Sequence, residues 1–480
     1  MRLTLIHPCI GRRLNQPYIR LWQMEPLPPA VIAGLTPREV QIKFYDDRME
    51  RIPFDEPTDV VGISVETYTA KRAYQIASEY RKRGVPVVMG GFQASLCPEE
   101  ISQYADAVIV GEAEEVWEQV LLDVQRGTLQ TYYRSNGRPS LGNLRPNRSI
   151  YKGKNYLPIG LVEAGRGCHF VCDFCAVQTV FNHTQTRRPA DDILIELEKM
   201  RDKPLIFFVD DNITSNMEQA KAFFRELAKL KIRWVSQASI NAAHDEEFLQ
   251  LIAASGCQGV LIGFESLNQD NLKKMNKGFN TMKGGYEKAL ENLRKHNIRL
   301  YITFVFGYDE DTEASFSETV AFALKHKFYI AAFNHLTPFP GTPLYRRLQR
   351  EDRLLYENWW LDDRYSYNMI PFQPAHMTPE RLQRGCVESR AEFYSYRNIW
   401  QRSFDPVNRS SSAMWWHFYG INYLFRREVR QRDYYPLGDE SFKGSLLKVR
   451  EIGEFFPSIS ESKTSELVLS REKIPTPPGN

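Results

Sequence analysis

Three of the seven cysteines lie within one short stretch, GRGCHFVCDFCAV. Cys168, Cys172 and Cys175 have the spacing C-x-x-x-C-x-x-C and follow a predicted strand, so a short loop can turn all three sulfurs toward one inorganic group. Three thiolates leave one iron of a four-iron cubane without a protein ligand. The spacing therefore indicates a 4Fe-4S cluster with one position open for an exchangeable ligand, as in catalytic metal sites.

Zinc is the alternative metal for this loop. Three cysteines could hold zinc together with His169 or a distant residue, but the neighbours Cys168 and His169 cannot easily bind one ion together, and no second C-x-x-C pair follows. Core thiols without any metal are a further alternative. The other cysteines are isolated in the sequence, and we expect them to be packing residues: Cys9, Cys97, Cys257 and Cys386.

The composition places these thiols in a folded protein of more than one domain. The chain has 480 residues, 42% hydrophobic and 25% charged, which is ordinary for globular proteins. A net charge of +3 gives no long-range attraction to nucleic acid or to anionic membranes. No stretch is long and apolar enough to span a bilayer, and no secretory signal is evident. With so few cysteines, we expect a cytoplasmic protein without a transmembrane segment or a nucleic-acid partner.

The first 135 residues alternate short β-branched runs with helical patterns, which predicts an α/β domain with a doubly wound parallel sheet. Ligands of such sheets bind beyond the carboxyl ends of the strands. The pair Gly90 and Gly91 could let a ligand approach bare backbone, or could form a tight turn. The residues expected at these strand ends are Ser64, Glu66, Thr67, Gly90, Gly91, Gly111 and Glu112.

Residues 136–158 are rich in Gly, Pro, Asn and Arg and are interpreted as a linker. From 159 to 342, six predicted strands alternate with helices, which favours a partial (βα)6 barrel over a second flat sheet. Barrels keep their chemistry at the carboxyl ends of the strands. The polar residues at these ends are Asp210, Asp211, Gln237, Ser239, Glu265 and Thr337.

Residues 343–455 have helical patterns and many aromatic side chains, and 456–480 have the composition of a flexible tail. The aromatic residues would suit a cap over a large apolar substrate, although aromatic side chains at helical spacing are more often core. The segment AMWWHFYGINYLF is too short to span a bilayer but could form an interfacial helix. These aromatic residues include Trp359, Trp360, Tyr365, Tyr367, Phe372, Trp415, Trp416, Phe418, Tyr419 and Tyr423.

These motifs together resemble the radical S-adenosylmethionine (radical SAM) enzymes, and in particular their cobalamin-binding branch. The cysteine loop, with Phe174 before its last cysteine, is the most specific feature. The softer motifs GGFQAS, DAVIVGEAEEVW, FVDDN, GFES, FVFGYDED and LTPFPGT occur in the family's order, and the resemblance covers residues 1 to about 400. It implies a Rossmann-like cobalamin-binding domain, a radical SAM barrel, and three cofactors: a 4Fe-4S cluster, S-adenosylmethionine (SAM) and cobalamin.

The resemblance also implies roles for single residues around SAM. Asp210, Asp211 and Asn212 correspond to positions near the methionine ammonium group, where acceptor side chains suit a positive charge. One of the paired aspartates is also expected to cap the helix that follows. The full set of expected SAM contacts is Phe174, Asp210, Asp211, Asn212, Gln237, Ser239 and Glu265.

For cobalamin, the resemblance implies contacts with the strand-end residues of the first domain. Thr67 could instead cap the turn before AKRAYQIASEY. Tyr18 and Trp22, in the long first loop, could line the lower corrin face or cover the sheet edge. The segment HPCIGRR lacks the D-x-H-x-x-G motif, so His7 is not expected to bind cobalt.

The activity implied is methylation of an unactivated carbon in a small-molecule or lipid-like substrate. One SAM would methylate cobalamin, and a second would give the 5′-deoxyadenosyl radical that removes a substrate hydrogen. A low-potential flavodoxin or ferredoxin would supply electrons. Two alternatives stay open: oxidative cyclisation or rearrangement with the same cofactors, and a zinc-stabilised corrinoid-binding protein that is not an enzyme.

Overall fold

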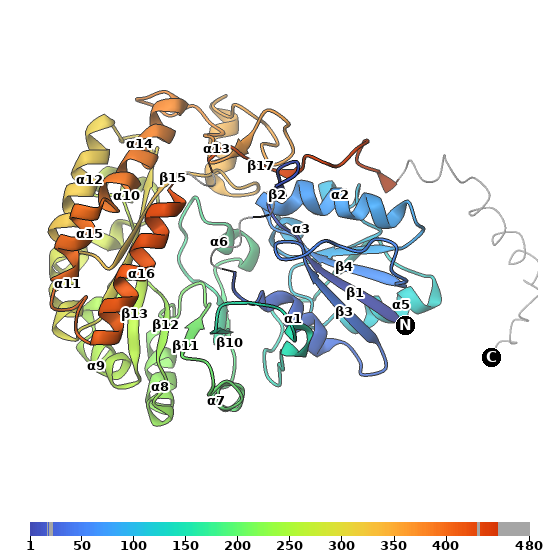
Figure 1. The fold of residues 1–480 in the computed structure, drawn as a ribbon, viewed down its shortest axis with the longest axis horizontal. Helices are drawn as coiled ribbons and strands as arrows, with labels where there is room; N and C mark the ends of the chain where they lie inside the picture. Colours follow the sequence, from blue (N-terminus) through green and yellow to red (C-terminus); the bar gives the residue numbers. More distant parts are fainter. Residues whose placement is uncertain (17, 19–22, 430–432, 450–480) are drawn as a thin grey trace, which may run out of the picture.

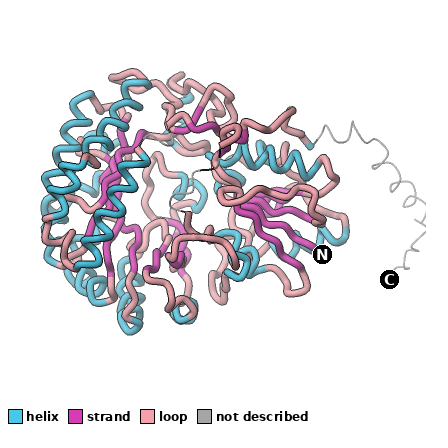
Figure 2. Tube along the Cα trace, in the orientation of Figure 1, coloured by secondary structure: helices cyan, strands magenta, loops and turns pink. Residues whose placement is uncertain are grey.

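The computed structural model describes residues 1–449 apart from 17, 19–22 and 430–432, and it contains two parallel sheets side by side (Figures 1 and 2). The expected flexible tail, 456–480, lies outside the described residues. The first sheet is six-stranded, with the order β3-β1-β4-β5-β6-β7 and parallel pairing throughout. Its strands are β1 (Arg2–His7), β3 (Gln41–Asp46), β4 (Val60–Ser64), β5 (Val87–Gly90), β6 (Ala107–Val110) and β7 (Tyr132–Arg134).

Both faces of this sheet are covered by helices, which confirms the doubly wound fold. Successive strand residues point to opposite faces, so Leu3 and Leu5 pack with α1 and α5, while Ile63 packs with α2 on the other side. Burial on both faces explains why the strands are almost continuously apolar. The helices are α1 (Leu27–Leu35), α2 (Ala70–Arg81), α3 (Phe92–Leu96), α4 (Pro98–Ile101) and α5 (Trp117–Arg126).

The second sheet is the predicted six-stranded partial barrel. Its order is β15-β14-β13-β12-β11-β8, again parallel, and the end strands β8 and β15 are not neighbours in that order. The strands are β8 (Ile159–Val162), β11 (Leu205–Phe208), β12 (Trp234–Ala238), β13 (Cys257–Glu265), β14 (Arg299–Phe306) and β15 (Ile330–His335). The helices between them are α7 (Ala190–Glu198), α8 (Met217–Leu227), α9 (Glu246–Ala254), α10 (Gln269–Lys274), α11 (Gly285–Lys295) and α12 (Glu313–Lys325).

Short elements connect the sheets to the loops around them. An antiparallel ribbon of β9 (Gly165–Gly167) and β10 (Gln185–Arg187) flanks the cysteine loop, and α6 (Ala176–Phe181) follows that loop directly. Helix α13 (Pro343–Arg350) begins the C-terminal region.

The C-terminal helices cover the open edge strand of the barrel. They are α14 (Pro379–Phe393), α15 (Tyr396–Ser403) and α16 (Ser412–Glu428). The Tyr394 hydroxyl donates to the Ala331 carbonyl at 2.9 Å and accepts from the Ala331 amide at 3.3 Å, so it occupies backbone groups that a neighbouring strand would otherwise pair. The buried guanidinium of Arg402 donates to the Phe328 carbonyl at 2.8 Å.

Residues 343–372, which begin with α13, join the barrel to the first domain. Trp359, Trp360 and Tyr365 are buried in the hydrophobic cluster that contains α2. The Trp360 indole N–H donates to both Glu100 carboxylate oxygens at 3.0 Å. The core interpretation is confirmed for these three aromatic residues, and the interpretation of 343–455 as a substrate cap stays a prediction.

The end of the described chain also returns to the first domain. The two-residue strand β18 (Gly438–Asp439) pairs in parallel with β2 (Gly11–Arg12), and the Val449 amide donates to the Gln103 carbonyl at 2.7 Å.

The aromatic residues Trp416 and Tyr423 on α16 are exposed and do not belong to the core. Within the described ranges, no helix is both long and apolar enough to cross a membrane.

We expect Trp360→Phe to lower the free energy of unfolding by about 1 to 3 kcal/mol, because the half-buried Glu100 carboxylate loses the bifurcated hydrogen bond from the indole N–H at the domain junction. Urea unfolding measures this change. Trp400→Phe is the matched control, since Trp400 is 58% exposed and its substitution should cost less than about 0.5 kcal/mol. Equal losses in the two variants would contradict the junction assigned to Trp360.

Candidate functional site

The cysteine loop follows β9, and hydrogen bonds from three other segments of the chain hold it in place. The Leu344 amide donates to the Asp173 carbonyl at 3.0 Å, and the Asn276 side chain donates to the Val171 carbonyl at 3.1 Å. The Tyr308 hydroxyl donates to the Asp173 carboxylate. The loop is therefore held by the C-terminal region and by the loops after β13 and β14 before any cofactor binds.

The three thiols lie within electrostatic range of one another. Burial raises the pKa of Cys172 to about 12; the ammonium of Lys277 opposes this rise, and Cys175 and Cys168 add to it. Burial likewise raises the pKa of Cys175. A thiol must lose its proton to bind a metal. At this buried site, the thiolates would therefore be stabilised by the bound metal ions.

The donor set fits a cubane better than a single zinc ion. In the described part of the chain, no three His, Cys, Asp or Glu side chains stand close enough together to hold one metal ion. A cubane needs no such convergence, because each thiolate binds a different iron at a separate corner. His169 is directed elsewhere, since its Nδ1 lies 2.7 Å from the Ser215 hydroxyl.

Two carboxylates just after β11, the fully buried Asp210 and the half-buried Asp211, hold the backbone that leads into the cysteine loop. Asp210 Oδ1 accepts from the Ala164 amide at 2.7 Å, and Asp211 Oδ2 accepts from the Gly167 amide at 2.7 Å. Burial raises the pKa of Asp210 to about 7 and that of Asp211 to about 6. The second oxygen of Asp210 is buried without a hydrogen-bond partner in the described residues, so it is free to accept from a ligand.

The expectation that one of these aspartates caps the next helix is wrong. Helix α8 begins at Met217, and its cap is Asn216, whose side chain accepts from the Gln219 amide at 3.1 Å. Asp210 and Asp211 lie well before the first residue of the helix. Their carboxylates instead accept hydrogen bonds from the Gly167 amide in β9 and from the Ala164 amide just before it.

Asn212 and Ser239, both predicted from the sequence, lie beside the first cysteine. The Asn212 amide nitrogen is 3.5 Å from Cys168 Sγ and 3.3 Å from the Ser239 hydroxyl. Thr214 completes this network, 3.1 Å from the same hydroxyl. Gln237 contributes its backbone carbonyl, which accepts from the Ile213 amide at 3.0 Å.

Sequence reasoning missed a buried ion pair next to the thiols. Lys277 Nζ lies 2.6 Å from Glu265 Oε1 and 6.0 Å from the centre of the Phe174 ring. Glu265 has a left-handed backbone, with φ of 63°, at a register shift in β13. Lys277 lies in a loop without periodicity, so no pattern in the sequence places it near the cysteines.

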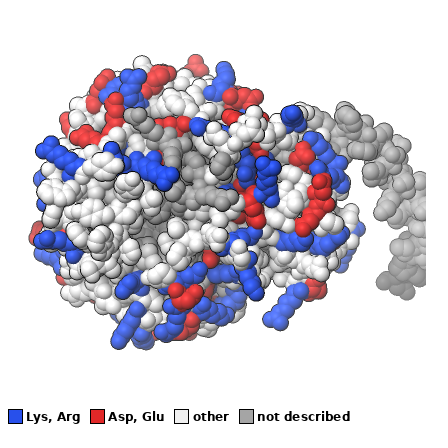
Figure 3. Space-filling model, in the orientation of Figure 1, with Lys and Arg blue, Asp and Glu red and all other residues white. Residues whose placement is uncertain are grey.

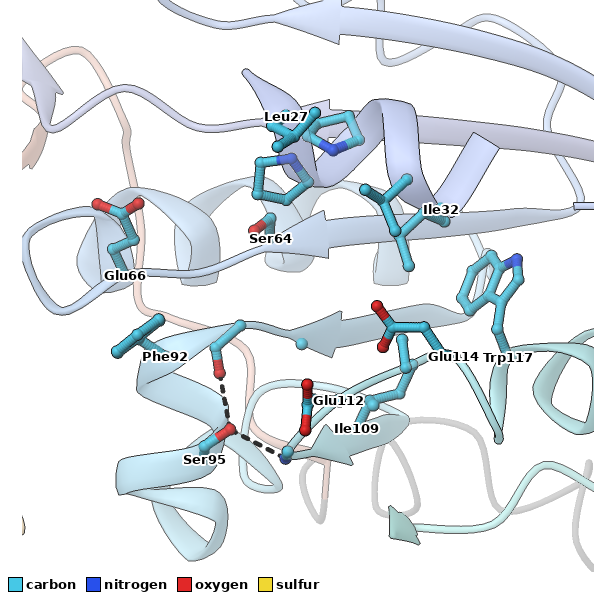
Figure 4. Close-up of a pocket in the computed structure, with 18 of the residues that line it drawn as sticks. Leu27, Ile32, Ser64, Glu66, Phe92, Ser95, Ile109, Glu112, Glu114 and Trp117 are labelled. Atoms are coloured by element: carbon cyan, nitrogen blue, oxygen red, sulfur yellow. Dashed lines mark hydrogen bonds between the residues drawn. The ribbon is translucent and has the colours of Figure 1, made fainter. Parts of the chain in front are cut away.

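A mostly apolar cavity of about 330 Å³ opens at the carboxyl ends of β4, β5 and β6 (Figure 4). Leu27, Ile32, Ile109 and Trp117 form part of its apolar wall. The cavity extends to the barrel, where Glu163, Phe181 and Asp211 line it. Six of the seven expected strand-end residues line it as well: Ser64, Glu66, Gly90, Gly91, Gly111 and Glu112.

The remaining residues expected to contact the corrinoid lie elsewhere. Thr67 is buried at the start of a 3-10 turn and does not line the cavity; it is Thr69 that accepts from the Glu66 amide at 3.0 Å and closes this turn. Tyr18 makes an edge contact with Tyr435, with ring centres 6.1 Å apart. Trp22 lies outside the described residues.

Two glycines shape the cavity for different reasons. Gly91 has φ of 103°, and a Cβ there would stand 2.8 Å from the Val65 carbonyl oxygen, so the close turn requires glycine. Gly111 has φ of 86°, and no atom lies within 4 Å of where its Cβ would be. Ser95 joins these two loops, since its hydroxyl accepts from the Gly111 amide at 2.9 Å and donates to the Gly91 carbonyl at 3.1 Å (Figure 4).

A cluster of ion pairs connects the cavity to the cysteine loop. Arg166, two residues before Cys168, bridges Glu112 at 3.0 Å and Glu114 at 2.8 Å in the first domain and Glu163 at 2.8 Å in the barrel. Arg138, from the segment between the domains, pairs with Glu112 from the other side. Glu112 is therefore an ionic link between the domains as well as part of the cavity wall.

Comparison with known proteins gives two family matches. Residues 162–323 match the Radical SAM superfamily, and residues 32–121 match the B12 binding domain.

Relatives match over most of the chain. Bacteriochlorophyllide d C-12(1)-methyltransferase of Chlorobaculum tepidum is 33% identical over 419 residues, which cover 85% of this chain and 89% of the relative. The C-8(2)-methyltransferase of the same organism is 29% identical, covering 78% and 86%. The structure of the radical SAM methyltransferase TsrM of Kitasatospora setae, with cobalamin and a 4Fe-4S cluster bound, has the same fold, with a TM-score of 0.63, 15% identity and coverage of 90% and 99%.

The pKa of Asp210 generates a prediction for unfolding in the absence of cofactors. Its ordinary value is 3.8, and burial raises it to about 7, so the folded chain keeps a proton that the unfolded chain releases between these pH values. This contribution to stability is full below pH 3.8 and is lost as the pH rises to about 7. We expect Asp210→Asn, which can still accept from the Ala164 amide, to show a smaller loss of thermal stability over this range than the wild type.

Asp55→Asn is the control for this measurement, because the Asp55 side chain is 94% exposed. It should follow the wild-type pH dependence of the melting temperature. If Asp210→Asn follows that curve as well, the carboxylate is not held protonated by its surroundings.

The position of Lys277 generates a second prediction. Its ammonium group acts on Cys172 and Cys175, and a positive charge near a cluster stabilises the reduced, more negative form. We expect Lys277→Met to make the midpoint potential of the reconstituted cluster more negative in a potentiometric titration followed by EPR. Lys274→Met, an exposed lysine of α10 paired with Glu310, should leave the potential unchanged. A potential that is insensitive to Lys277 would refute this electrostatic role.

Proposed function

Because the chain belongs to the cobalamin-binding radical SAM methyltransferases, we propose that its substrate is a tetrapyrrole related to bacteriochlorophyllide. The enzyme methylates an unactivated carbon and uses a 4Fe-4S cluster, SAM and cobalamin. The substrate proposal is carried by the level of identity with proteins named for one substrate. The two bacteriochlorophyllide d methyltransferases of Chlorobaculum tepidum are 33% and 29% identical to this chain, whereas the hopanoid C-2 methylase of Rhodopseudomonas palustris is 24% identical.

When bound, the cluster and SAM supply one-electron radical chemistry, and cobalamin supplies a transferable methyl group. The residues of this chain position these groups and exclude water. Cys168, Cys172 and Cys175 are the proposed iron ligands. Asn212 donates toward Cys168, which restrains the first sulfur and reduces its charge.

The proposed SAM contacts lie in the cysteine loop and at or just after the ends of the barrel strands β11, β12 and β13. The unpartnered Oδ2 of Asp210 is suited to accept from the ammonium group, and its raised pKa means that a cation would favour the charged carboxylate. Ser239 lies in the same network as Asn212. The other proposed contacts are Phe174, Asp211, Gln237 and Glu265.

For cobalamin, the cavity beside Gly111 is the proposed site of the nucleotide tail. Its apolar walls bury a large ligand, while Ser64 and Glu66 offer polar groups at the strand ends. The bare backbone at Gly111 leaves room where any other residue would place a side chain. Thr67, Tyr18 and Trp22 remain candidates outside this cavity.

We further propose a cytoplasmic location and electron delivery by a low-potential flavodoxin or ferredoxin. Radical cleavage of SAM consumes one electron in each turnover, so the enzyme needs an external electron donor.

The test is anaerobic turnover of the reconstituted protein with SAM, cobalamin, a chemical reductant and bacteriochlorophyllide d. We expect a product heavier by one methylene unit, together with S-adenosylhomocysteine and 5′-deoxyadenosine. Cys172→Ser is the control and should give none of these products. Deoxyadenosine with an oxidised, unmethylated tetrapyrrole would indicate cyclisation, and methylation of an isoprenoid substrate but not of the tetrapyrrole would overturn the substrate class.

A further inference from the structure

An unusual number of exposed aromatic side chains lies on two neighbouring C-terminal helices. Of the eleven large hydrophobic side chains exposed in the described part of the chain, five lie between residues 396 and 423. Monomeric proteins rarely expose such a group without a partner for it. We call this group the α15–α16 aromatic surface, and its members are Tyr396 (62% exposed), Trp400 (58%), Phe404 (44%), Trp416 (68%) and Tyr423 (55%).

The five side chains form one continuous face. Tyr396, Trp400 and Phe404 are spaced four residues apart along α15 and its end, and the Trp400 and Phe404 rings are 4.8 Å apart. On α16, Trp416 and Tyr423 are about two turns apart. The rings of Tyr396 and Tyr423 are 6.5 Å apart and join the two helices. Figure 3 shows a broad uncharged expanse over these helices, with Lys and Arg side chains along its margins.

Basic residues outnumber acidic ones around this surface. The acidic residues between 392 and 428 are Glu392, which is exposed, Asp405, which is buried and pairs with Arg294 at 2.7 Å, and Glu428 at the end of α16. Arg397, Arg409 and Arg427 are exposed. The small net charge of the whole chain therefore conceals a locally basic surface.

A groove beside α15 and α16 is lined by both aromatic and basic side chains. It has a volume of about 420 Å³ and is lined by Tyr396, Tyr423, Arg426 and Arg427. The Arg426 guanidinium lies 4.1 Å from the centre of the Tyr396 ring, which orients it beside the aromatic surface. Paired arginines beside aromatic rings are suited to a phosphate group at the boundary of an apolar phase.

We propose that α15 and α16 dock the protein on the surface of an anionic lipid bilayer. Tryptophan and tyrosine favour the headgroup boundary, where the ring is buried and the polar atom stays hydrated, and arginines gain from anionic headgroups. The rings project from the outer faces of the helices, so a deformable bilayer can receive them without a complementary groove in a partner. Both helices lie on the surface and do not cross the bilayer.

The docking surface lies one helix away from the interior of the barrel. The opposite face of α16 carries the fully buried Phe418, and its Phe425 ring is 6.3 Å from Tyr301 of β14. Strand alternation puts Tyr301 on the other face of the sheet from Phe304, which packs against α12. Docking would thus bring the barrel close to an apolar substrate dissolved in the bilayer. This consequence rests on the proposed function, whereas docking on the bilayer does not depend on it.

The test is flotation of the full-length protein with vesicles of phosphatidylcholine, alone or with phosphatidylglycerol. We expect binding to the anionic vesicles that weakens with added salt, since the arginines contribute. Trp400→Ser with Trp416→Ser should reduce the partition coefficient by about tenfold or more. Leu355→Ser, which changes an exposed apolar residue elsewhere on the protein, is the control and should bind like the wild type.

A second measurement uses the unmodified protein and does not depend on the folding of the variants. Brominated lipids in the anionic vesicles should quench tryptophan fluorescence, because Trp400 and Trp416 would enter the headgroup region. Absence of quenching and of flotation would overturn the proposal. So would a concentration-dependent dimer that the double variant abolishes without any vesicle binding, because the surface would then bind a second copy of the chain.

Discussion

The position of the cysteine loop depends on two neighbouring carboxylates, one fully buried and one half-buried. Asp210 and Asp211 accept the backbone amides of Ala164 and Gly167, and the first cysteine follows at the next position. Burying two neighbouring carboxylates is unfavourable, as their raised pKa values indicate. That cost is offset by fixing the loop and, at Asp210, by leaving one oxygen ready for a cationic ligand. Both carboxylates thus hold the backbone before the cysteine loop, and in the proposed mechanism Asp210 would also bind SAM.

The second constraint is the relative position of the two domains, because the cavity proposed to bind cobalamin is lined by residues of both. Arg166 binds carboxylates of the first domain and of the barrel, close to the cysteine loop. Trp359 and Trp360 extend a single hydrophobic cluster across the junction, and Tyr68 of the first domain lies 3.3 Å from Thr337 of the barrel rim. Ionic, apolar and hydrogen-bonded contacts thus join the two domains, so a shift of one domain would change the cavity that both of them line.

The fold could be predicted from the sequence because it rests on periodicity. Most strands of the two sheets are largely apolar runs and could be predicted from the sequence, whereas the edge strand β7 is only three residues long. The strand-end glycines and the cysteine spacing could also be interpreted from the sequence, because each depends only on the local chain.

Predictions failed where the outcome depended on tertiary contacts. Asp210 and Asp211 accept from the amides of Ala164 and Gly167 and do not cap the following helix. The ion pair of Lys277 with Glu265 joins two residues that no sequence pattern relates. Aromatic residues at similar spacing became core at Trp359 and exposed surface at Trp416, a difference that only packing decides.

The central claim is that Cys168, Cys172 and Cys175 hold a cubane whose fourth iron is free to bind SAM. The most direct measurement is Mössbauer spectroscopy of anaerobically reconstituted protein, with and without SAM, for each Cys→Ala variant and for Cys257→Ala as a control. The account predicts that only the control retains a four-iron cluster in which one iron site changes when SAM is added. An unchanged iron spectrum after the loss of any one of the three thiols would contradict it.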